Sequence, residues 1–441
     1  MIRQAIVLVT ALRWALEDCA GLPLFKRALL AAQKGGIEEF YIVAREAAQL
    51  QPLLQDTRLK ATLRWIEGGL PEEFFKPDTK AVPATSTGVL VIKAESVFDA
   101  KVIEEVQNWG LGEAVASLAV RKGTAERGTS VRLEGEKVAG FGDEEADALT
   151  AGILLVRPEA LRGIDLGDHR NPITFTELIH HLANKGTVRA VNVTKEFCHE
   201  VTSLETLKGT KKALYKRLGL PTDGLMAIHV NRKLSRLLTR VLIRLPITPN
   251  QITLCSLLIG LTTCWFFWQG GYWYGVFAVL IYQASVIVDL SDGEVARLKF
   301  MQSQFGAWLD SVCDSIVYAG IFLAIALALS KQGHANVLWA GTVSTTAALV
   351  CLNLDAYLLM QKDTAGASNT SVRLRRTRSG TATFLEMLSN VDTFQIILFL
   401  FVFSGQMLWF TWGMAVGWGG YLTVSLSRLF LGWIGRSRAA A

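Results

Sequence analysis

A long, nearly uncharged stretch between Pro249 and Leu354 most limits what this chain can fold into. Its apolar runs, such as YGVFAVLIYQASVIV and SIVYAGIFLAIALAL, are typical of helices that cross the roughly 30 Å hydrocarbon core of a bilayer. The cations of this stretch are Arg297, Lys299 and Lys331. Its acids are Asp289, Asp292, Glu294, Asp310 and Asp314. Ionised carboxylates at membrane depth are costly to bury and are usually functional, so these acids are the first candidates for a site.

Six membrane-spanning helices are predicted, over residues 249–268, 272–296, 305–329, 335–359, 383–403 and 407–428. The turns QGGYW and SGQML lack Lys and Arg, whereas the loops on the other side are basic. Those loops contain Arg297, Lys299, Lys362, Arg373, Arg375, Arg376, Arg378, Arg428, Arg436 and Arg438. Because Lys and Arg concentrate in cytoplasmic loops, we predict a multi-pass protein of the inner (cytoplasmic) membrane, with its termini and the acidic stretch on the cytoplasmic side.

The N-terminal half has the composition of a soluble α/β domain. Strand-like runs such as AIVLVT and EEFYIVA alternate with helical patterns such as LPLFKRALLAAQKGG. This alternation favours a mostly parallel sheet covered by helices. We therefore predict an α/β domain at 1–220, a linker with an interfacial helix at 221–247, and an all-α bundle of six transmembrane helices at 248–435.

The segment NRKLSRLLTRVLIRL, at residues 231–245, is predicted to form an amphipathic helix. Arginine recurs every fourth residue from Arg232 to Arg244, and apolar residues fill most of the other positions. Such a helix lies in the membrane interface, with its cations near anionic headgroups. The alternative is a solvated helix that packs on the soluble domain.

Charge and cysteine usage exclude other classes of protein. The net charge of +6 is modest for 441 residues, and we expect no nucleic-acid partner. The six cysteines form no CxxC pair and have no His partners at metal spacing, which indicates reduced or buried thiols in a cytosol-facing protein.

The acids pair up at helical spacings. Asp289 and Asp292 are three residues apart, and Asp310 and Asp314 are four apart, so each pair shares a helix face. The segment LKFMQSQF between the pairs is short enough for a turn, which lets them converge. Four clustered carboxylates repel one another unless divalent cations neutralise them, and hard oxygen ligands suit Mg²⁺ or Mn²⁺. Two bridged ions suit phosphoryl chemistry. Glu294 is predicted to be a solvated neighbour.

The complete spacing, D-x2-D-G-x2-A-R-x8-G-x3-D-x3-D, resembles the motif of the CDP-alcohol phosphotransferase family of six-helix integral membrane enzymes. Its fixed positions are Asp289, Asp292, Gly293, Ala296, Arg297, Gly306, Asp310 and Asp314. The stretch TPNQIT at 248–253 also resembles that family, and the resemblance covers about residues 227–435. The alternative is that the acids only pack a helical bundle.

This resemblance implies roles for the motif residues. Asp289, Asp292 and Asp310 would be metal ligands, and Asp314 would be both a ligand and the base for the attacking alcohol. The CDP site would be lined by Asp292, Gly293, Ala296, Arg297 and Gly306. An alcohol would attack the β-phosphorus of a CDP-linked donor, and CMP would leave. Family members are often homodimers through the membrane domain.

The basic loop SVRLRRTRSG, at 371–380, allows two interpretations. Arg373, Arg375 and Arg376 could bind the phosphate of an acceptor such as inositol phosphate. Alternatively, they only anchor the loop on the cytoplasmic side.

The N-terminal half resembles the sugar-1-phosphate nucleotidyltransferases. The similarity lies in GLPLFKRALLAAQKGGIEEFYIVA, AGILLVRPEAL, TELIHHLANKGTVRAVNV and VTSLETLKG, which occur in the family's order. Cytidylyltransferases of this type are fused to CDP-alcohol phosphotransferases in bifunctional proteins that make CDP-inositol from CTP and inositol 1-phosphate, and then di-myo-inositol phosphate phosphate. The whole chain resembles that architecture.

Several family features are missing from this half. The Gly-rich G-x-G-x-R loop that wraps the triphosphate is replaced by VTALRWALEDCAG, and the Lys before PLL is Leu22. The metal-binding Asp of DGD is replaced by KAE, which leaves Glu95, and the later Asp of W-x-D aligns with Glu200. We therefore predict a degenerate domain. Two glutamates could still bind Mg²⁺, so an active domain stays an alternative.

The sequence thus predicts a Mg²⁺-dependent CDP-alcohol phosphotransferase of phospholipid biosynthesis, embedded in the lipid bilayer. CDP-inositol and CDP-diacylglycerol are both candidate donors. A bifunctional enzyme that also makes CDP-inositol is one alternative, and a non-catalytic nucleotide-sensing membrane scaffold is another.

Overall fold

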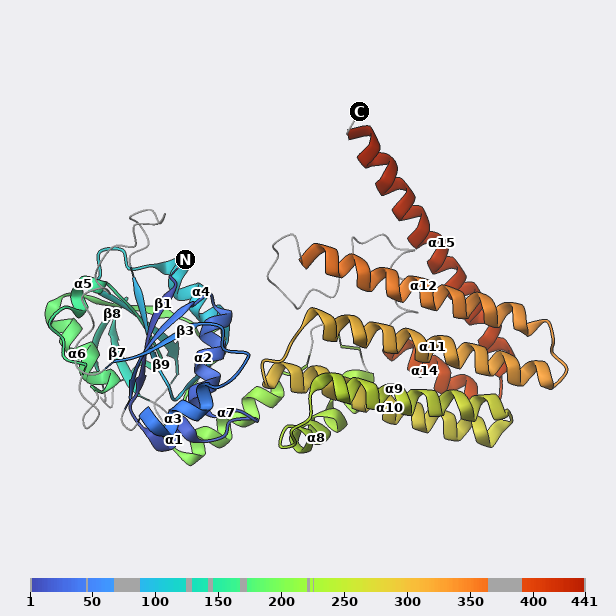
Figure 1. Ribbon diagram of the computed structural model, residues 1–441, viewed down its shortest axis with the longest axis horizontal. Helices are drawn as coiled ribbons and strands as arrows, with labels where there is room; N and C mark the ends of the chain where they lie inside the picture. Colours follow the sequence, from blue (N-terminus) through green and yellow to red (C-terminus); the bar gives the residue numbers. More distant parts are fainter. Residues whose placement is uncertain are drawn as a thin grey trace. The chain divides into compact units, whose positions relative to one another are not determined.

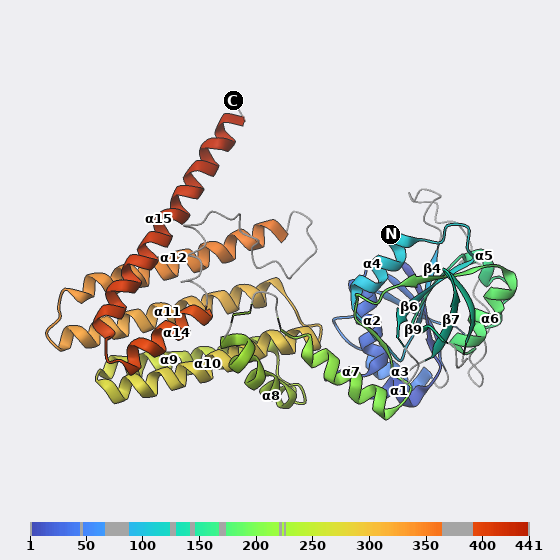
Figure 2. The same ribbon diagram turned by 180° about the vertical axis from the view of Figure 1, so that it is seen from behind.

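The computed structural model describes residues 2–44, 47–66, 88–123, 129–141, 146–166, 173–219, 223–224, 226–363 and 391–439. The chain divides into two compact units, unit 1 (Met1–Lys216) and unit 2 (Arg217–Ala441). Figure 1 and Figure 2 show both units, and each is described here by itself.

Unit 1 is built on a nine-stranded sheet with the strand order β3-β2-β1-β4-β9-β6-β10-β8-β7. The strands are β1 (Gln4–Val9), β2 (Glu39–Ala44), β3 (Thr62–Trp65), β4 (Val89–Lys93), β6 (Ala116–Lys122), β7 (Ser130–Glu134), β8 (Lys137–Phe141), β9 (Ala148–Val156) and β10 (Val188–Asn192). A second, small sheet pairs β5 (Ser96–Phe98) with β11 (Cys198–Glu200) in antiparallel fashion.

Helices flank this sheet, which confirms the predicted α/β class. They are α1 (Leu12–Leu16), α2 (Leu24–Lys34), α3 (Ala47–Leu54), α4 (Ala100–Trp109), α5 (Pro158–Leu161), α6 (Phe175–Lys185) and α7 (Leu204–Lys216). One core cluster joins Ile6 and Val91 of the sheet to Phe175 and Leu178 of α6. Helix α6 begins with a capping box, in which Thr174 and Glu177 bind each other's backbone amide.

The sheet is mixed, and the prediction of a mostly parallel sheet was wrong. Strands β1, β2, β3 and β4 pair in parallel, but β9 pairs antiparallel with both β4 and β6. Strand β9 is buried along its whole length. A strand buried on both faces reads as a continuous apolar run, and such a run contains no information on strand direction.

Unit 2 is helical. Its elements are a π-helical turn η2 (Ala227–Asn231) and the helices α8 (Arg232–Leu242), α9 (Pro249–Gln269), α10 (Tyr272–Leu298), α11 (Gln304–Lys331), α12 (Val337–Asp363), α14 (Val391–Phe403) and α15 (Met407–Ala439). Helices α9 to α12 lie side by side along their lengths (Figure 1). The core of unit 2 is rich in aromatic rings, with Phe394 of α14 in contact with Tyr318 and Phe322 of α11.

Four helices in the described part of unit 2 are long and apolar enough to cross a membrane: Pro249–Gln269, Tyr272–Leu298, Gln304–Lys331 and Val337–Leu354. They coincide with the first four predicted spans, so unit 2 is a membrane-embedded domain. The predicted count of six is not reproduced. Of the fifth span, residues 383–390 lie outside the described residues, and α14 is short. Helix α15 covers the sixth predicted span at 407–428. Its Gly and Trp residues lower its mean hydropathy, so it is not among the four.

Candidate active site

Three carboxylates from neighbouring helices meet at one end of the bundle. Asp289 and Asp292 of α10 and Asp310 of α11 each place a carboxylate oxygen within 4.8 Å of the others. The five-residue turn between α10 and α11 allows this approach. Within this turn, Phe300 adopts a left-handed backbone conformation with a φ of 54°. Asp314 lies one turn further along α11 and lines a pocket together with Asp289. The two pairs that the sequence predicted to converge therefore do so.

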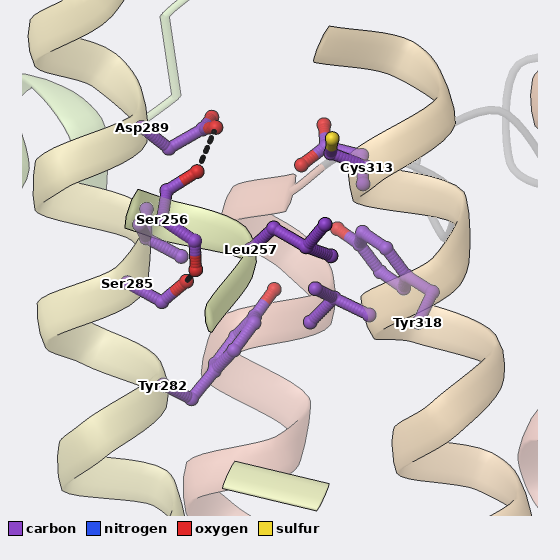
Figure 3. Close-up of a pocket in the computed structure, with 10 residues that line it drawn as sticks. Ser256, Leu257, Tyr282, Ser285, Asp289, Cys313 and Tyr318 are labelled. Atoms are coloured by element: carbon purple, nitrogen blue, oxygen red, sulfur yellow. Dashed lines mark hydrogen bonds between the residues drawn. The ribbon is translucent and has the colours of Figure 1, made fainter. Parts of the chain in front are cut away.

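Helix α9 supplies two hydroxyl donors to the pair on α10. Thr253 Oγ1 donates to Asp292 Oδ2. Ser256 Oγ donates to Asp289 Oδ1 at 3.2 Å (Figure 3). The two hydroxyls are three residues apart on α9, as the two carboxylates are on α10. The spacing of the acids does not predict these donors, although Thr253 ends the TPNQIT stretch at 248–253. Helix α9 is started just before them by a capping box between Thr248 and Gln251.

A narrow pocket opens next to the carboxylates, between α9, α10 and α11 (Figure 3). Its lining residues are Ser256, Leu257, Tyr282, Ser285, Val286, Asp289, Cys313, Asp314, Val317 and Tyr318. Polar groups and carboxylates thus share the pocket with aliphatic and aromatic walls. A reacting polar group could be held there beside apolar surface.

The charge of the cluster calls for a cation. Asp292 is 7% exposed, and no described Lys or Arg forms an ion pair with Asp289 or Asp292. Three like charges within 4.8 Å of one another are strongly unfavourable, and two hydroxyl donors do not neutralise them. Carboxylate oxygens in such a group are the ligands that Mg²⁺ and Mn²⁺ prefer. The residues present therefore fit a divalent metal centre.

Two glycines of the motif stand where a Cβ would make tight contacts with neighbouring side chains. A Cβ on Gly306, in the first turn of α11, would come within 3.0 Å of Ser303 Oγ and 3.1 Å of Asn250 Oδ1. A Cβ on Gly293 would lie 3.3 Å from Arg297 Nη1. Arg297 itself, near the end of α10, donates from Nη2 to the carbonyl oxygen of Leu218 at 3.2 Å. Ala296, beside it, is half-buried.

The predicted acceptor residues Arg373, Arg375 and Arg376 lie outside the described residues. Their role stays a prediction.

Glu294 is buried, and the prediction of a solvated neighbour was wrong. Its side chain is 0% exposed, and it accepts hydrogen bonds from Ser235 Oγ and Thr239 Oγ1, both at 2.8 Å. Both donors belong to α8, so this carboxylate fastens α8 to α10 on the side of α10 away from Asp292. A motif position can vary between proteins and still be essential to the packing of one of them.

Arg232 also differs from its prediction. Its guanidinium contacts Glu294 at 3.2 Å and binds both carboxylate oxygens of Asp223, at 2.8 and 2.9 Å. It is 3% exposed, so it does not reach lipid headgroups. Hydrogen bonds and charge from Asp223 and Glu294 raise the pKa of Arg232 despite the opposing effect of burial. Arg232, Ser235 and Thr239 of α8 thus point into unit 2. The exposed residues of α8 include Leu234, Leu237 and Val241 together with Lys233 and Arg240.

A second buried polar contact holds the turn before α8. Asn231 Nδ2 donates to Gln395 Oε1 of α14 at 3.0 Å, and Gln283 Nε2 of α10 donates to Asn231 Oδ1 at 2.7 Å. Asn231 and Gln395 are fully buried. Helix α8 is therefore attached to α10 by polar groups at both Asn231 and Glu294.

Comparisons with known proteins agree with this site. Residues 246–424 match the family model described as CDP-alcohol phosphatidyltransferase. The chain is 25% identical over 332 residues to the "Bifunctional IPC transferase and DIPP synthase" of Aquifex aeolicus, covering 72% of this chain and 73% of that protein. That alignment is longer than unit 2 and therefore extends into unit 1.

Two further matches concern the separate units. Over 113 residues, 25% of this chain and 50% of the relative, the chain is 34% identical to the "Phosphatidylinositol phosphate synthase" of Cutibacterium acnes. A solved inositol-1-phosphate CTP transferase from T. maritima covers 48% of this chain and 96% of that chain, at 15% identity and a TM-score of 0.37. The matched residues 246–424 include Asp289, Asp292, Asp310 and Asp314.

Replacement of Glu294 tests whether it anchors α8. Glu294→Ala should destabilise unit 2 by about 3–5 kcal/mol, because it leaves Arg232 with one carboxylate partner and removes the shortest hydrogen bonds of two buried hydroxyls. Glu294→Gln should cost less, since its amide still bonds both hydroxyls. Thermal unfolding in detergent measures both, with the exposed Glu104→Gln as the matched control. If Glu294→Ala unfolds like that control, the side chain is solvated after all.

Proposed function

We propose that this chain, which carries a CDP-alcohol phosphatidyltransferase-family domain at residues 246–424, transfers a substituted phosphate from a CDP-alcohol to a second alcohol and releases CMP. The observation that carries the proposal is the cluster of Asp289, Asp292 and Asp310 within 4.8 Å, inside that domain. A pocket beside this cluster is lined by Asp314. A displacement at phosphorus requires oxygen ligands for a metal and a further carboxylate that can accept a proton, and Asp314 is placed to be the latter.

The four aspartates would together bind the metal. Two Mg²⁺ or Mn²⁺ ions would be held by Asp289, Asp292, Asp310 and Asp314. Bound there, these ions supply positive charge to the donor pyrophosphate and to the CMP that leaves. Thr253 and Ser256 fix the orientation of Asp292 and Asp289 through their hydroxyls.

Asp314 is the proposed base. The acceptor hydroxyl oxygen attacks the β-phosphorus of the donor, its proton passes to Asp314, and the bond from the β-phosphorus to the bridging oxygen breaks. That oxygen and its electron pair leave with CMP. Asp314 suits this task because it lines the same pocket as Asp289, where an acceptor hydroxyl can be held.

The CDP moiety would bind along Asp292, Gly293, Ala296, Arg297 and Gly306. These residues lie at the end of α10 and the start of α11, beside the carboxylates. Without side chains, Gly293 and Gly306 let the backbone lie close to Arg297 and to Asn250. Arg297 can direct its guanidinium to a phosphate there.

The donor is CDP-inositol or CDP-diacylglycerol, and the acceptor is an alcohol such as inositol phosphate. One relative is named a DIPP synthase and another a phosphatidylinositol phosphate synthase, which favours inositol phosphate chemistry. Arg373, Arg375 and Arg376 are proposed to bind the acceptor phosphate.

The wider arrangement follows from the predicted topology. The enzyme lies in the inner membrane as a homodimer, with both termini and the carboxylates on the cytoplasmic side. The α/β domain spans 1–220, the linker and interfacial helix 221–247, and the membrane domain 248–435. The exposed apolar face of α8, with Leu234, Leu237 and Val241, supports a position against lipid.

Asp314→Asn tests the assignment of the base. CMP release should fall by about 10²–10⁴-fold, because the amide cannot accept the hydroxyl proton. Binding of the CDP donor should stay within a few-fold of the unaltered protein, since Asp289, Asp292 and Asp310 are kept. Turnover of purified protein with Mg²⁺ and a panel of CDP-alcohols and acceptors measures the first quantity, and equilibrium binding the second. Near-normal turnover in Asp314→Asn would contradict this role, as would absence of Mg²⁺-dependent CMP release from the unaltered protein.

A bifunctional enzyme is the second candidate, because the alignment with the Aquifex aeolicus relative extends into unit 1. It predicts that the chain consumes CTP and inositol 1-phosphate and releases pyrophosphate. The informative form of this assay uses Asp310→Asn, which should be inactive in unit 2 and unchanged in unit 1. Pyrophosphate release by this variant would establish the bifunctional enzyme, and its absence leaves transfer alone.

A further inference from the structure

A second group of buried charges lies in unit 1, at the ends of β4 and β11. Lys93 ends β4, Glu95 follows two residues later, and Glu200 ends β11. Glu95 is 1% exposed and Glu200 is 6% exposed. These two glutamates are the residues that the sequence analysis left as possible ligands of Mg²⁺.

We propose that the Lys93 ammonium stands in place of a divalent cation beside Glu95 and Glu200, so that unit 1 binds no Mg²⁺–nucleotide and a separate protein must make the CDP-alcohol. The first part concerns unit 1 alone. The second part rests on the proposed function of unit 2.

Glu200 accepts hydrogen bonds from protein donors on both of its carboxylate oxygens. Lys93 Nζ donates to Glu200 Oε1 in a buried ion pair. Thr129 adds its hydroxyl to Oε1 at 3.1 Å and its backbone N–H to Oε2 at 3.4 Å. Each oxygen therefore already accepts from a protein donor, and Lys93 brings positive charge directly to Oε1.

Glu95 is held by the segment that follows β1. The backbone N–H of Ala11 donates to Glu95 Oε1 at 2.6 Å, and the Thr10 hydroxyl lies 3.3 Å from both carboxylate oxygens. Ala11 is the residue from which α1 starts. Backbone amides at such a strand-to-helix turn are the donors that a nucleotide phosphate would need, and here a glutamate of the same chain takes one.

The rest of this turn is also tied down from within. The buried guanidinium of Arg27 donates through Nε and Nη2 to the carbonyl oxygen of Cys19, and through Nη2 to that of Ala20. A buried arginine that could have met a phosphate is therefore used on backbone carbonyls. The turn keeps its shape without a ligand.

The local charge disfavours a further cation. Lys93 pairs with Glu200 and ends β4 two residues before Glu95, so its ammonium already supplies positive charge to this group. An added divalent cation would be repelled by the ammonium of Lys93.

The consequence concerns the origin of the donor. In cytidylyl transfer, a phosphate oxygen of the alcohol phosphate attacks the α-phosphorus of CTP, the bond to the β-phosphate breaks, and pyrophosphate leaves. That step needs positive charge on the triphosphate, which a Mg²⁺ ion on two carboxylates would supply. Glu95 and Glu200 are instead bound by donors of the protein itself. The CDP-alcohol therefore comes from a nucleotidyl transfer on another protein.

Hydrogen exchange of the full-length protein in detergent tests this inference, because it reports on unit 1 separately from the metal site of unit 2. Peptides that cover residues 5–16 and 89–98 are followed with and without millimolar Mn²⁺ and CTP. In the unaltered protein we expect no change in their exchange. Slower exchange of these peptides with Mn²⁺ and CTP would overturn the inference.

Lys93→Ala provides the converse test, with the exposed Lys137→Ala as the matched control. If Lys93 replaces the cation, Mn²⁺ should now slow exchange of the 89–98 peptide several-fold in Lys93→Ala and leave Lys137→Ala unchanged. A folded Lys93→Ala protein without this Mn²⁺ response would contradict the replacement. If Lys93→Ala does not fold, the measurement on the unaltered protein still decides the question.

The supply of donor is tested by activity. CMP release from added CDP-alcohol should proceed in the unaltered protein, whereas CTP with inositol 1-phosphate should give neither pyrophosphate nor CMP. Addition of a separate inositol-1-phosphate cytidylyltransferase should restore CMP release from those precursors. Pyrophosphate release without that addition would refute this part. Loss of CMP release from the CDP-alcohol itself would instead refute the function proposed for unit 2.

Discussion

Three carboxylates within 4.8 Å of one another at the end of a membrane bundle are the constraint on which unit 2 depends. Their mutual repulsion has to be offset, since burial of like charges is strongly unfavourable. Helix α9 contributes hydroxyls from Thr253 and Ser256. On the opposite side, Glu294 fastens α10 to α8. The surroundings of α10 thus hold the aspartates in position and leave their remaining charge for a metal.

The two units neutralise buried acids in different ways. In unit 2, no described Lys or Arg pairs with Asp289 or Asp292, so the charge is available to a divalent cation and to the phosphates that it binds. In unit 1, Lys93 pairs directly with Glu200, and the start of α1 binds Glu95. An internal ammonium makes the second group independent of metal. We infer that this difference separates a reactive centre from an inert one.

Much of this could be predicted from the sequence, because spacing within one helix determines which residues share a face. The first four spans and the convergence of Asp289, Asp292 and Asp310 follow from such spacing. Spacing cannot tell which neighbouring element covers a face. For that reason Glu294 and Arg232 were predicted to be exposed, and the donors Thr253 and Ser256 were missed. Strand β9 is apolar on both faces, so its antiparallel direction was hidden as well.

The central claim is that the aspartate cluster holds a metal beside the pyrophosphate of the donor. The most direct measurement is ³¹P relaxation of CDP in the presence of Mn²⁺ and the full-length protein. We expect Mn²⁺ to enhance relaxation of the β-phosphorus strongly, and this effect to disappear in Asp292→Asn and Asp310→Asn. Enhancement that is absent from the unaltered protein, or that persists in both variants, would contradict the account.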